Sequence, residues 1–453
     1  MGKRKNKNKE KMSKLELGFT ILSLIFLIGF TCFYAYRFVH YYRVFNPKTV
    51  SGERKEIMGA TVRKNNPVIY EGDGLYSVKG TFVFKGDVDT NYVRYSNLLW
   101  RIVKIYNDNS ILLITDDYVN NLMWDDDSND YKESNIRNWL IENGNNTGIF
   151  EKSLRDKDKY LQPNTLCKDN VDDLESFSCT ETVSTDYASL LNLNDYVNSL
   201  NDGSSYMNNS NNIWLSTSAG DDMVWHVSEG NVSKSKPDNG YAIKPIITLK
   251  KTAVVQSGSG TISDPYVFEE EVAKDLDTYS YVKLDNDIWR VYEENKNSVR
   301  LILDDYYGGE YNTYSFSPID NKFSTNINYS LAKYLNTTLY DSLSYKDLLV
   351  ECDWYTGEYT KVSQYNYKNV FSSKVSAKVG LYNVSDIKIN SSLSNYFFMT
   401  PADNRMIYSF NNDENLYSSK ITYIKRIRPA ICINKTKIVD GNGTKNSPYE
   451  LEV

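Results

Sequence analysis

Two tryptophan–arginine pairs are the residues of this 453-residue chain best suited to binding a ligand. Trp100 and Arg101 recur as Trp289 and Arg290, at a spacing of 189 residues (289 − 100). Tryptophan can stack on a sugar ring, and arginine can pair with a carboxylate. The structural alternative, which alternation along a strand favours, is a buried tryptophan beside an arginine bonded to the protein itself. With two tryptophans of later strands added, the ligand-binding candidates are Trp100, Arg101, Trp214, Trp225, Trp289 and Arg290.

An acidic run offers oxygen ligands for a cation. Asp125, Asp127 and Asn129 have the spacing that opens a calcium-binding loop. However, Asp130 stands where such a loop needs glycine, and Ile136 where it needs a bidentate glutamate. The pattern therefore favours a solvated acidic loop, with calcium at the first three residues as the alternative. No other cofactor is expected.

Recognised catalytic motifs are absent from the sequence. The chain contains no G-x-S-x-G, H-E-x-x-H or phosphate-binding loop. Of its two histidines, His40 falls beside an apolar segment, and His226 has a serine at the matching place in the second repeat described below. We therefore favour a binding protein over an enzyme. The alternative is an enzyme with a carboxylate-lined cleft, for which Asp116, Asp117 and Asp125 are candidates.

The cysteines leave two structural questions open. Cys167 and Cys179 lie 12 residues apart (179 − 167) in a polar loop. A disulfide between them would stabilise the fold by about 3 kcal/mol, and a reduced pair is an equal alternative. For Cys352 and Cys432 the reduced state is favoured, because nothing in the sequence brings them together. Cys32 lies in an apolar segment and is expected to be inert.

That apolar segment determines the expected location of the protein. Residues 1–16 carry seven positive and two negative side chains, and residues 17–36 carry no charge. This length matches the ~20 residues that cross a ~30 Å hydrocarbon layer as a helix, and the flanking charge places the N-terminus in the cytoplasm. A cleaved signal peptide, and a pilin-type leader processed after Gly18, are the alternatives. The rest of the chain carries a net charge of −11 (−6 for the whole minus +5 for residues 1–16), which disfavours nucleic acid.

The remainder of the chain repeats itself. The strongest match pairs NYVRYSNLLWRIV at 91–103 with SYVKLDNDIWRVY at 280–292. Signals that recur in one order, with small insertions, indicate tandem duplication. The later matches are 116–118 with 304–306, 135–140 with 330–335, 244–245 with 428–429, and 258–268 with 441–451.

The shared segments predict strands and short helices. Alternating large and small residues at 91–103 indicate adjacent strands, and apolar residues three and four apart at 135–140 indicate an amphipathic helix. Turn residues at 108–109 and 296–297 predict hairpins, and the segments after Pro245 and Pro429 predict buried strands. We therefore expect an α+β, strand-rich fold. The expected parts are a cytoplasmic tail (1–16), a transmembrane helix (17–36), a linker (37–68), repeat 1 (69–269) and repeat 2 (270–453).

At these motifs the chain resembles a widespread group of exported tandem-domain proteins from AT-rich bacteria. The shared signals are a YV…WRI opening, a short helix, a cysteine-bearing loop, a W-x-L-S strand, an R-P strand and a Gly-x-Gly-Thr…Pro-Tyr tail. Lys244 replaces the usual arginine, and 397–399 departs from the tryptophan strand. The strands are also loosely similar to C-type-lectin-like and formylglycine-generating-enzyme-like folds. The resemblance implies export and brings no catalytic residues.

Together these patterns predict a single-pass membrane protein with two α+β domains outside the cell. We expect a non-enzymatic module that binds a cell-wall polysaccharide, another glycan or a surface protein. The alternatives are an extracytoplasmic wall-remodelling enzyme with its site in repeat 1, and a pseudopilin-like structural subunit. A binding protein predicts a shallow exposed aromatic surface, whereas an enzyme predicts a deep cleft lined by carboxylates.

Overall fold

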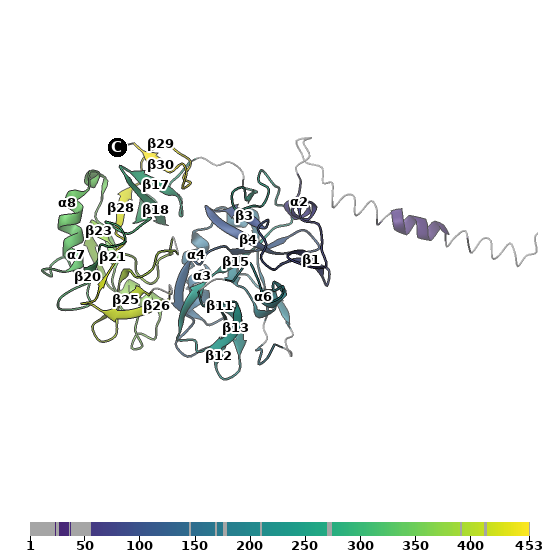
Figure 1. Ribbon diagram of the computed structural model, residues 1–453, viewed down its shortest axis with the longest axis horizontal. Coiled ribbons are helices and arrows are strands. Elements are labelled where there is room, and N and C mark those ends of the chain that lie inside the picture. The colour runs from purple at the N-terminus through teal and green to yellow at the C-terminus, as the bar shows by residue number, and fades with distance from the viewer. Residues whose placement is uncertain are drawn as a thin grey trace, which may run out of the picture.

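The computed structural model describes most of the chain as a mixed α+β fold rich in strands, which confirms the expected fold class. Only a few residues of the predicted membrane segment are among those described, and 27–35 are helical (Figure 1). In the part of the chain that is described, no helix has the length and apolar character needed to cross a membrane. The predicted cytoplasmic tail (1–16) and most of the predicted transmembrane helix (17–36) lie outside the described residues. The described residues are 23, 27–35, 37, 56–144, 146–167, 170–174, 179–208, 211–269, 274–389, 392–411 and 415–452.

We call residues 56–269 half 1 and residues 274–452 half 2. Half 1 contains a nine-stranded sheet with the main order β1-β2-β4-β5-β15-β10, joined at its sides by β3, β7 and β16. A five-stranded sheet has the order β13-β12-β11-β14-β6, and β8 pairs with β9. The strands are β1 Gly74–Val78, β2 Thr81–Lys85, β3 Tyr92–Tyr95, β4 Leu98–Ile105, β5 Ile111–Thr115, β6 Asn120–Met123, β7 Leu161–Gln162, β8 Thr165–Cys167, β9 Glu181–Val183, β10 Ala188–Leu190, β11 Ile213–Ala219, β12 Met223–Ser228, β13 Asn231–Ser235, β14 Gly240–Ile243, β15 Pro245–Leu249 and β16 Tyr266–Val267. The helices are α2 Met58–Asn65, α3 Asn135–Leu140, α4 Ile149–Lys152, α5 Lys157–Tyr160 and α6 Leu193–Asn198.

Half 2 contains a seven-stranded sheet with the order β23-β28-β19-β18-β17-β30-β29. Beside it lie a three-stranded sheet, β24-β25-β26, and the pairs β20-β27 and β21-β22. The strands are β17 Tyr281–Leu284, β18 Asp287–Glu294, β19 Ser298–Leu303, β20 Tyr314–Ser315, β21 Cys352–Tyr355, β22 Lys374–Ala377, β23 Val379–Gly380, β24 Phe397–Ala402, β25 Met406–Phe410, β26 Leu416–Lys420, β27 Ile424–Lys425, β28 Ala430–Asn434, β29 Ile438–Asp440 and β30 Tyr449–Leu451. The helical segments are α7 Leu331–Tyr334, a π-helical turn Leu335–Leu339, α8 Tyr340–Ser342, and 3-10 turns at Lys346–Leu348 and Tyr367–Ser372.

The two main sheets pair their strands in the same register. Val93 lies opposite Trp100 in half 1, as Val282 lies opposite Trp289 in half 2. The last short strand of each half, β16 or β30, adds in parallel to the strand that opens it. Bulges also recur: β4 shifts register two residues after Trp100, and β18 two residues after Trp289. Because bulges are specific local features, their recurrence is a stronger match than strand order alone.

One boundary differs from the sequence prediction. Residues 37–68 were expected to form a linker, but α2 lies within them and packs on half 1. Met58 and Val62 have no exposed surface, and the Met58 amide donates to the carbonyl of Ala253. The prediction is wrong for 56–68, because apolar residues at helical spacing bury one face of α2. Residues 38–55 lie outside those described.

The halves are held together by specific contacts between half 1 and residues 359–388 of half 2. Trp139, on α3, has no exposed surface and donates its indole N–H to the carbonyl of Ser385 at 2.8 Å. Asn120 on β6 donates to the carbonyl of Val384, and the amide of Lys388 donates to the carbonyl of Val119. The edge formed by β6 and α3 is therefore buried against half 2. Figure 1 shows α3 and α4 at this junction.

Candidate functional site

The four candidate tryptophans form part of the core. Each is at most 6% exposed, and each indole N–H donates to an oxygen of the protein. Their ring faces are packed against neighbouring side chains and offer no surface for stacking a sugar. The structure therefore favours the alternative in which these tryptophans are buried core residues: Trp100, Trp214, Trp225 and Trp289.

The two candidate arginines are both buried but are bonded differently. Arg101 donates through Nε to Asn91 Oδ1, through Nη1 to Tyr92 Oη, both at 2.7 Å, and through Nη2 to a backbone carbonyl. Arg290 donates one hydrogen bond, from Nε to the carbonyl of Tyr279 at 3.0 Å. The structure thus satisfies the first arginine internally and leaves the second with spare donors.

The candidate calcium residues organise a loop. Asn129 donates its side-chain amide to two carbonyls of the β11–β12 hairpin, and the Asp125 carboxylate accepts the backbone amides of Asp126 and Asn135. The pKa of the Asp125 carboxyl is raised by burial. Half 2 has the same arrangement at Asn321, which donates to two carbonyls of the β24–β25 hairpin.

The loop 125–131 of half 1 therefore corresponds to 317–323 of half 2, at a spacing of 192 (321 − 129). Aspartates at 125 and 127 are replaced there by serine and isoleucine, so the shared role of the loop is to support a hairpin. The Asn129/Asn321 pair was the signal that could have revealed it. Asp127 contributes to the loop through its backbone amide, which opposes the effect of burial on the pKa of the Asp125 carboxyl.

The candidate cysteines form disulfides, and the candidate histidine is part of the core. Cys167 and Cys179 form a disulfide, and so do Cys352 and Cys432, although the reduced state was favoured for the second pair. The bridge between Leu349 and Ile433, with the hydrogen bond from the Val350 amide to the Cys432 carbonyl, brings the second pair together across 80 residues. His226 is buried among aromatic rings, and burial lowers its pKa, which fits packing rather than proton transfer.

A shallow groove that the sequence analysis did not identify lies over β20 and α7. Its volume is about 560 Å³. The rings of Tyr314 and Tyr334 lie 5.0 Å apart with their hydroxyls 3.2 Å from each other, and Tyr329 is 92% exposed. We call this site the tyrosine groove; its lining includes Tyr314, Asn328, Tyr329, Lys333, Tyr334 and Thr337.

Local structure fixes the polar groups of the tyrosine groove. Ser330 caps α7 by accepting the amide of Lys333, and Lys333 Nζ donates to Asn328 Oδ1 at 2.6 Å. Helix α7 then widens into the π-helical turn, which carries Thr337 at the groove wall. Such turns are rare and are frequent at functional sites. Burial and its tyrosine neighbours raise the pKa of Tyr334, so its hydroxyl stays protonated and able to donate.

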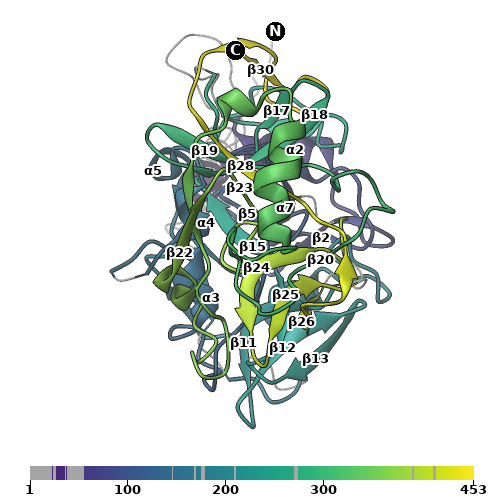
Figure 2. The ribbon, with the colours of Figure 1, turned by 90° about the vertical axis from the view of Figure 1, so that its left-hand side faces the viewer.

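The tyrosine groove occupies the face of half 2 that corresponds to the buried face of half 1. Register places Tyr314 where half 1 has Leu122, since Lys425 and Tyr241 are their matching partners. In half 1, the neighbouring Met123 amide donates to Tyr359 Oη of half 2. Figure 1 shows α7 and β20 at the end of the molecule away from half 1, and Figure 2 shows them facing the viewer from that end. The same face is thus covered in one half and open in the other.

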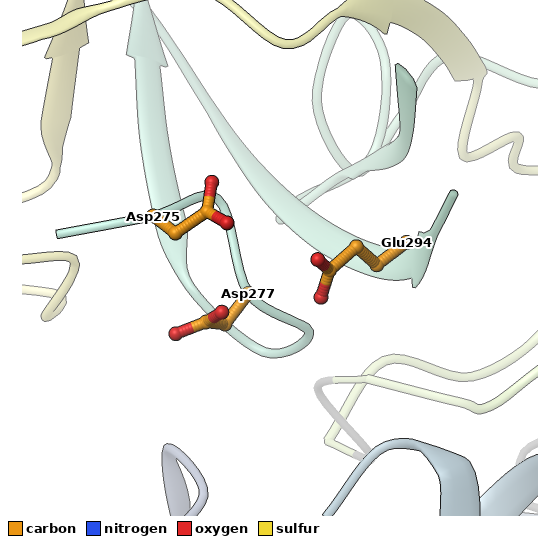
Figure 3. A group of neighbouring side chains, drawn as sticks. All are labelled: Asp275, Asp277 and Glu294. Atoms are coloured by element: carbon orange, nitrogen blue, oxygen red, sulfur yellow. The ribbon is translucent and has the colours of Figure 1, made fainter. Parts of the chain in front are cut away.

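Three carboxylates meet where the halves join. Asp275 and Asp277, before β17, and Glu294, at the end of β18, have carboxylate oxygens within 4.8 Å of one another (Figure 3). This spacing could hold a divalent cation. However, Lys435 Nζ lies 3.0 Å from Asp275 and 2.5 Å from Glu294, and Arg155 lies 3.2 Å from Asp277. These cations balance the cluster, so we interpret it as an ion-pair network at the junction.

No protein-family model matches this chain, and neither a curated protein nor a solved structure matches it. The functional argument therefore rests on the geometry of the site.

Proposed function

We propose that this chain is a membrane-anchored, extracytoplasmic binding protein that holds a glycan in the tyrosine groove. The observation that carries the proposal is the open groove on a face that half 1 buries. Its tyrosine rings offer apolar faces for sugar C–H groups, and Asn328, Lys333 and Thr337 offer hydrogen bonds to sugar hydroxyls. A cell-wall polysaccharide is the partner that this combination and the predicted location favour.

The proposal treats the halves as two copies of one folding unit that stand outside the cell on the N-terminal segment. Matching registers and matching bulges support the duplication. A duplicated unit can keep one copy as a scaffold while the other copy changes its surface. In this chain half 1 uses the β6/α3 edge to contact half 2, and half 2 has tyrosines on the matching edge.

Binding of the full-length chain to an array of bacterial cell-wall glycans tests the proposal. Tyr329→Ala is expected to weaken binding about tenfold, because an exposed ring in contact with a ligand contributes on the order of 1 kcal/mol or more. Tyr70→Ala is the matched control, since Tyr70 is 90% exposed in half 1 and lies outside the groove. Absence of binding to every glycan, or equal losses in both variants, would refute the glycan assignment. Retained binding of a surface protein alone would replace the glycan with a protein partner.

A further inference from the structure

A second cavity lies in the cleft between the two halves. It has a volume of about 400 Å³, within the roughly 300–1,000 Å³ of small-molecule sites. Both halves contribute charged side chains to its wall. They include Arg94, Asp116 and Asp117 from half 1, and Arg290, Asp304 and Lys388 from half 2.

Arg290 lines this cleft with most of its hydrogen-bonding capacity unused. It is 9% exposed, and its guanidinium stacks 3.7 Å from the ring centroid of Tyr281. Its Nε donates to the carbonyl of Tyr279, while Nη1 lies 3.7 Å from Asp304, beyond hydrogen-bond distance. Among the described residues, neither Nη1 nor Nη2 of Arg290 donates a hydrogen bond. Neither Nη atom is sealed from solvent, so both can donate to a group that enters the cleft.

The matching arginine of half 1 shows which hydrogen-bond partners Arg290 lacks. Arg101 is completed by Asn91, Tyr92 and the carbonyl of Val88. At a spacing of 189 residues (290 − 101), half 2 has Ser280 in place of Asn91 and Asp277 in place of Val88. The serine is too short to reach as asparagine does, and Asp277 is turned toward Arg155 at 3.2 Å. Half 2 keeps the tyrosine, as Tyr281, but Arg290 stacks on its ring, and the asparagine acceptor is replaced.

The charge of the cleft wall suits an anion. Arg94 and Lys445 are exposed at its rim, and Lys388 is buried in its wall with Nζ donating to the carbonyls of Asn383 and Asp386. Of the carboxylates, Asp116 is already paired with Arg101 at 3.4 Å. The other two carboxylates of the wall, Asp117 and Asp304, are outnumbered by the four cationic side chains of Arg94, Arg290, Lys388 and Lys445.

We propose that the cleft between the halves binds a small carboxylate ligand, with its carboxylate on Nη1 and Nη2 of Arg290. The planar guanidinium matches a carboxylate in a bidentate pair, which is the strongest form of this contact. The site is separate from the tyrosine groove and does not depend on the proposed glycan function.

Calorimetric titration of the full-length chain with acetate and N-acetylglycine tests the site, with N-acetylglycinamide as the neutral counterpart. The acids are expected to bind and the amide is not. Arg290→Lys is expected to weaken acid binding at least tenfold, because lysine cannot form the bidentate pair. Arg101→Lys is the matched control, and its Kd should stay within twofold. Equal binding of acid and amide, no binding of either acid, or an unchanged Kd in Arg290→Lys would overturn the proposal.

Two further measurements keep the test decisive. Thermal unfolding checks that each variant is folded. If Arg290→Lys does not fold, Lys445→Gln replaces it as the test variant. Lys445 lies at the exposed rim of the cleft, and Lys445→Gln is expected to weaken acid binding about threefold. An unchanged Kd in that variant would overturn the anion assignment. Titration with inorganic phosphate separates the anion classes, because a phosphate that binds through Arg290 while neither carboxylate does would exclude a carboxylate site.

Discussion

Half 1 and half 2 share a sheet register but use matching positions differently. The β6/α3 face of half 1 is buried by residues 359–388, whereas the β20/α7 face of half 2 is open and lined by tyrosines. The contact is heterologous, since it joins unlike faces of two similar units. Such a contact necessarily leaves one face of the second unit unpaired. The difference shows how duplication can free a surface for binding without any change of fold.

The two halves also differ at one pair of buried charged residues. In half 1 Lys104 pairs with both carboxylate oxygens of Asp195, at 2.7 and 3.0 Å. In half 2 the matching positions are Glu293 and Asp386, so the carboxylate there has no cation in the place of Lys104. Burial raises the pKa of Asp386 to about 6. The Asp386 carboxylate instead accepts hydrogen bonds from the backbone and side-chain amides of Asn383.

The largest effect is expected where half 2 covers half 1. Trp139→Ala removes a fully buried ring and the hydrogen bond to Ser385, and should lower the free energy of unfolding by roughly 3–5 kcal/mol. Urea unfolding should then show two transitions in place of one. Leu335→Ala serves as the control, because Leu335 lies five residues after the Ser330 cap as Trp139 lies five residues after the Ser134 cap. It should destabilise without separating the transitions. A single transition in both variants would contradict the described junction.

A smaller difference is expected between the two arginines. Arg101→Met removes hydrogen bonds to four acceptors and should lower the free energy of unfolding by about 3 kcal/mol. Arg290→Met removes one hydrogen bond and a long ion pair with Asp304, and should cost about 1 kcal/mol. Chemical denaturation of the pair measures the difference. Equal losses would mean that Arg290 is as well satisfied as Arg101.

The matched aspartates should also differ. Asp195→Asn weakens the pair with Lys104 and should destabilise by about 2 kcal/mol at pH 5. Asp386→Asn should cost about 1 kcal/mol at pH 5. Burial raises the pKa of Asp386 to about 6, so the carboxyl is already mostly protonated there, and the substitution sets an N–H group against one of the two Asn383 donors. Thermal unfolding at pH 5 measures both losses, and a larger loss in Asp386→Asn than in Asp195→Asn would contradict the raised pKa of Asp386.

The smallest effect concerns Asp277, which half 1 replaces with Val88. Although Arg155 is close, burial outweighs it and raises the pKa of Asp277 to about 6 from an ordinary value of 3.8. Between these values the folded state holds a proton that the unfolded state has lost, so stability falls as pH rises through this window. Relative to Asp277→Asn, the wild type should lose on the order of 1 kcal/mol between pH 4 and 6.5. Val88→Ala should shift the Tm equally at all pH values, and a pH-independent difference in Asp277→Asn would refute the pKa assignment.

The sequence predicted the local elements and missed what depends on packing between the halves. The helix expected at 135–140 is α3, the turn at 108–109 joins β4 to β5, and Pro245 opens β15 as predicted. These follow from alternation, turn residues and backbone limits, which are local properties. The tyrosine groove could not be predicted, because Tyr314 and Leu122 are both apolar residues of short strands. Only the covering segment 359–388 distinguishes their environments.

The contact between the halves also has a mechanical consequence. Helix α2, where the N-terminal segment joins the folded part, and the tyrosine groove lie at opposite ends of the molecule (Figure 1). Tension between a tether at one end and a captured polymer at the other would cross both halves in series. The hydrogen bonds between the halves, such as Trp139–Ser385 and Asn120–Val384, would then share that load with the covalent junction.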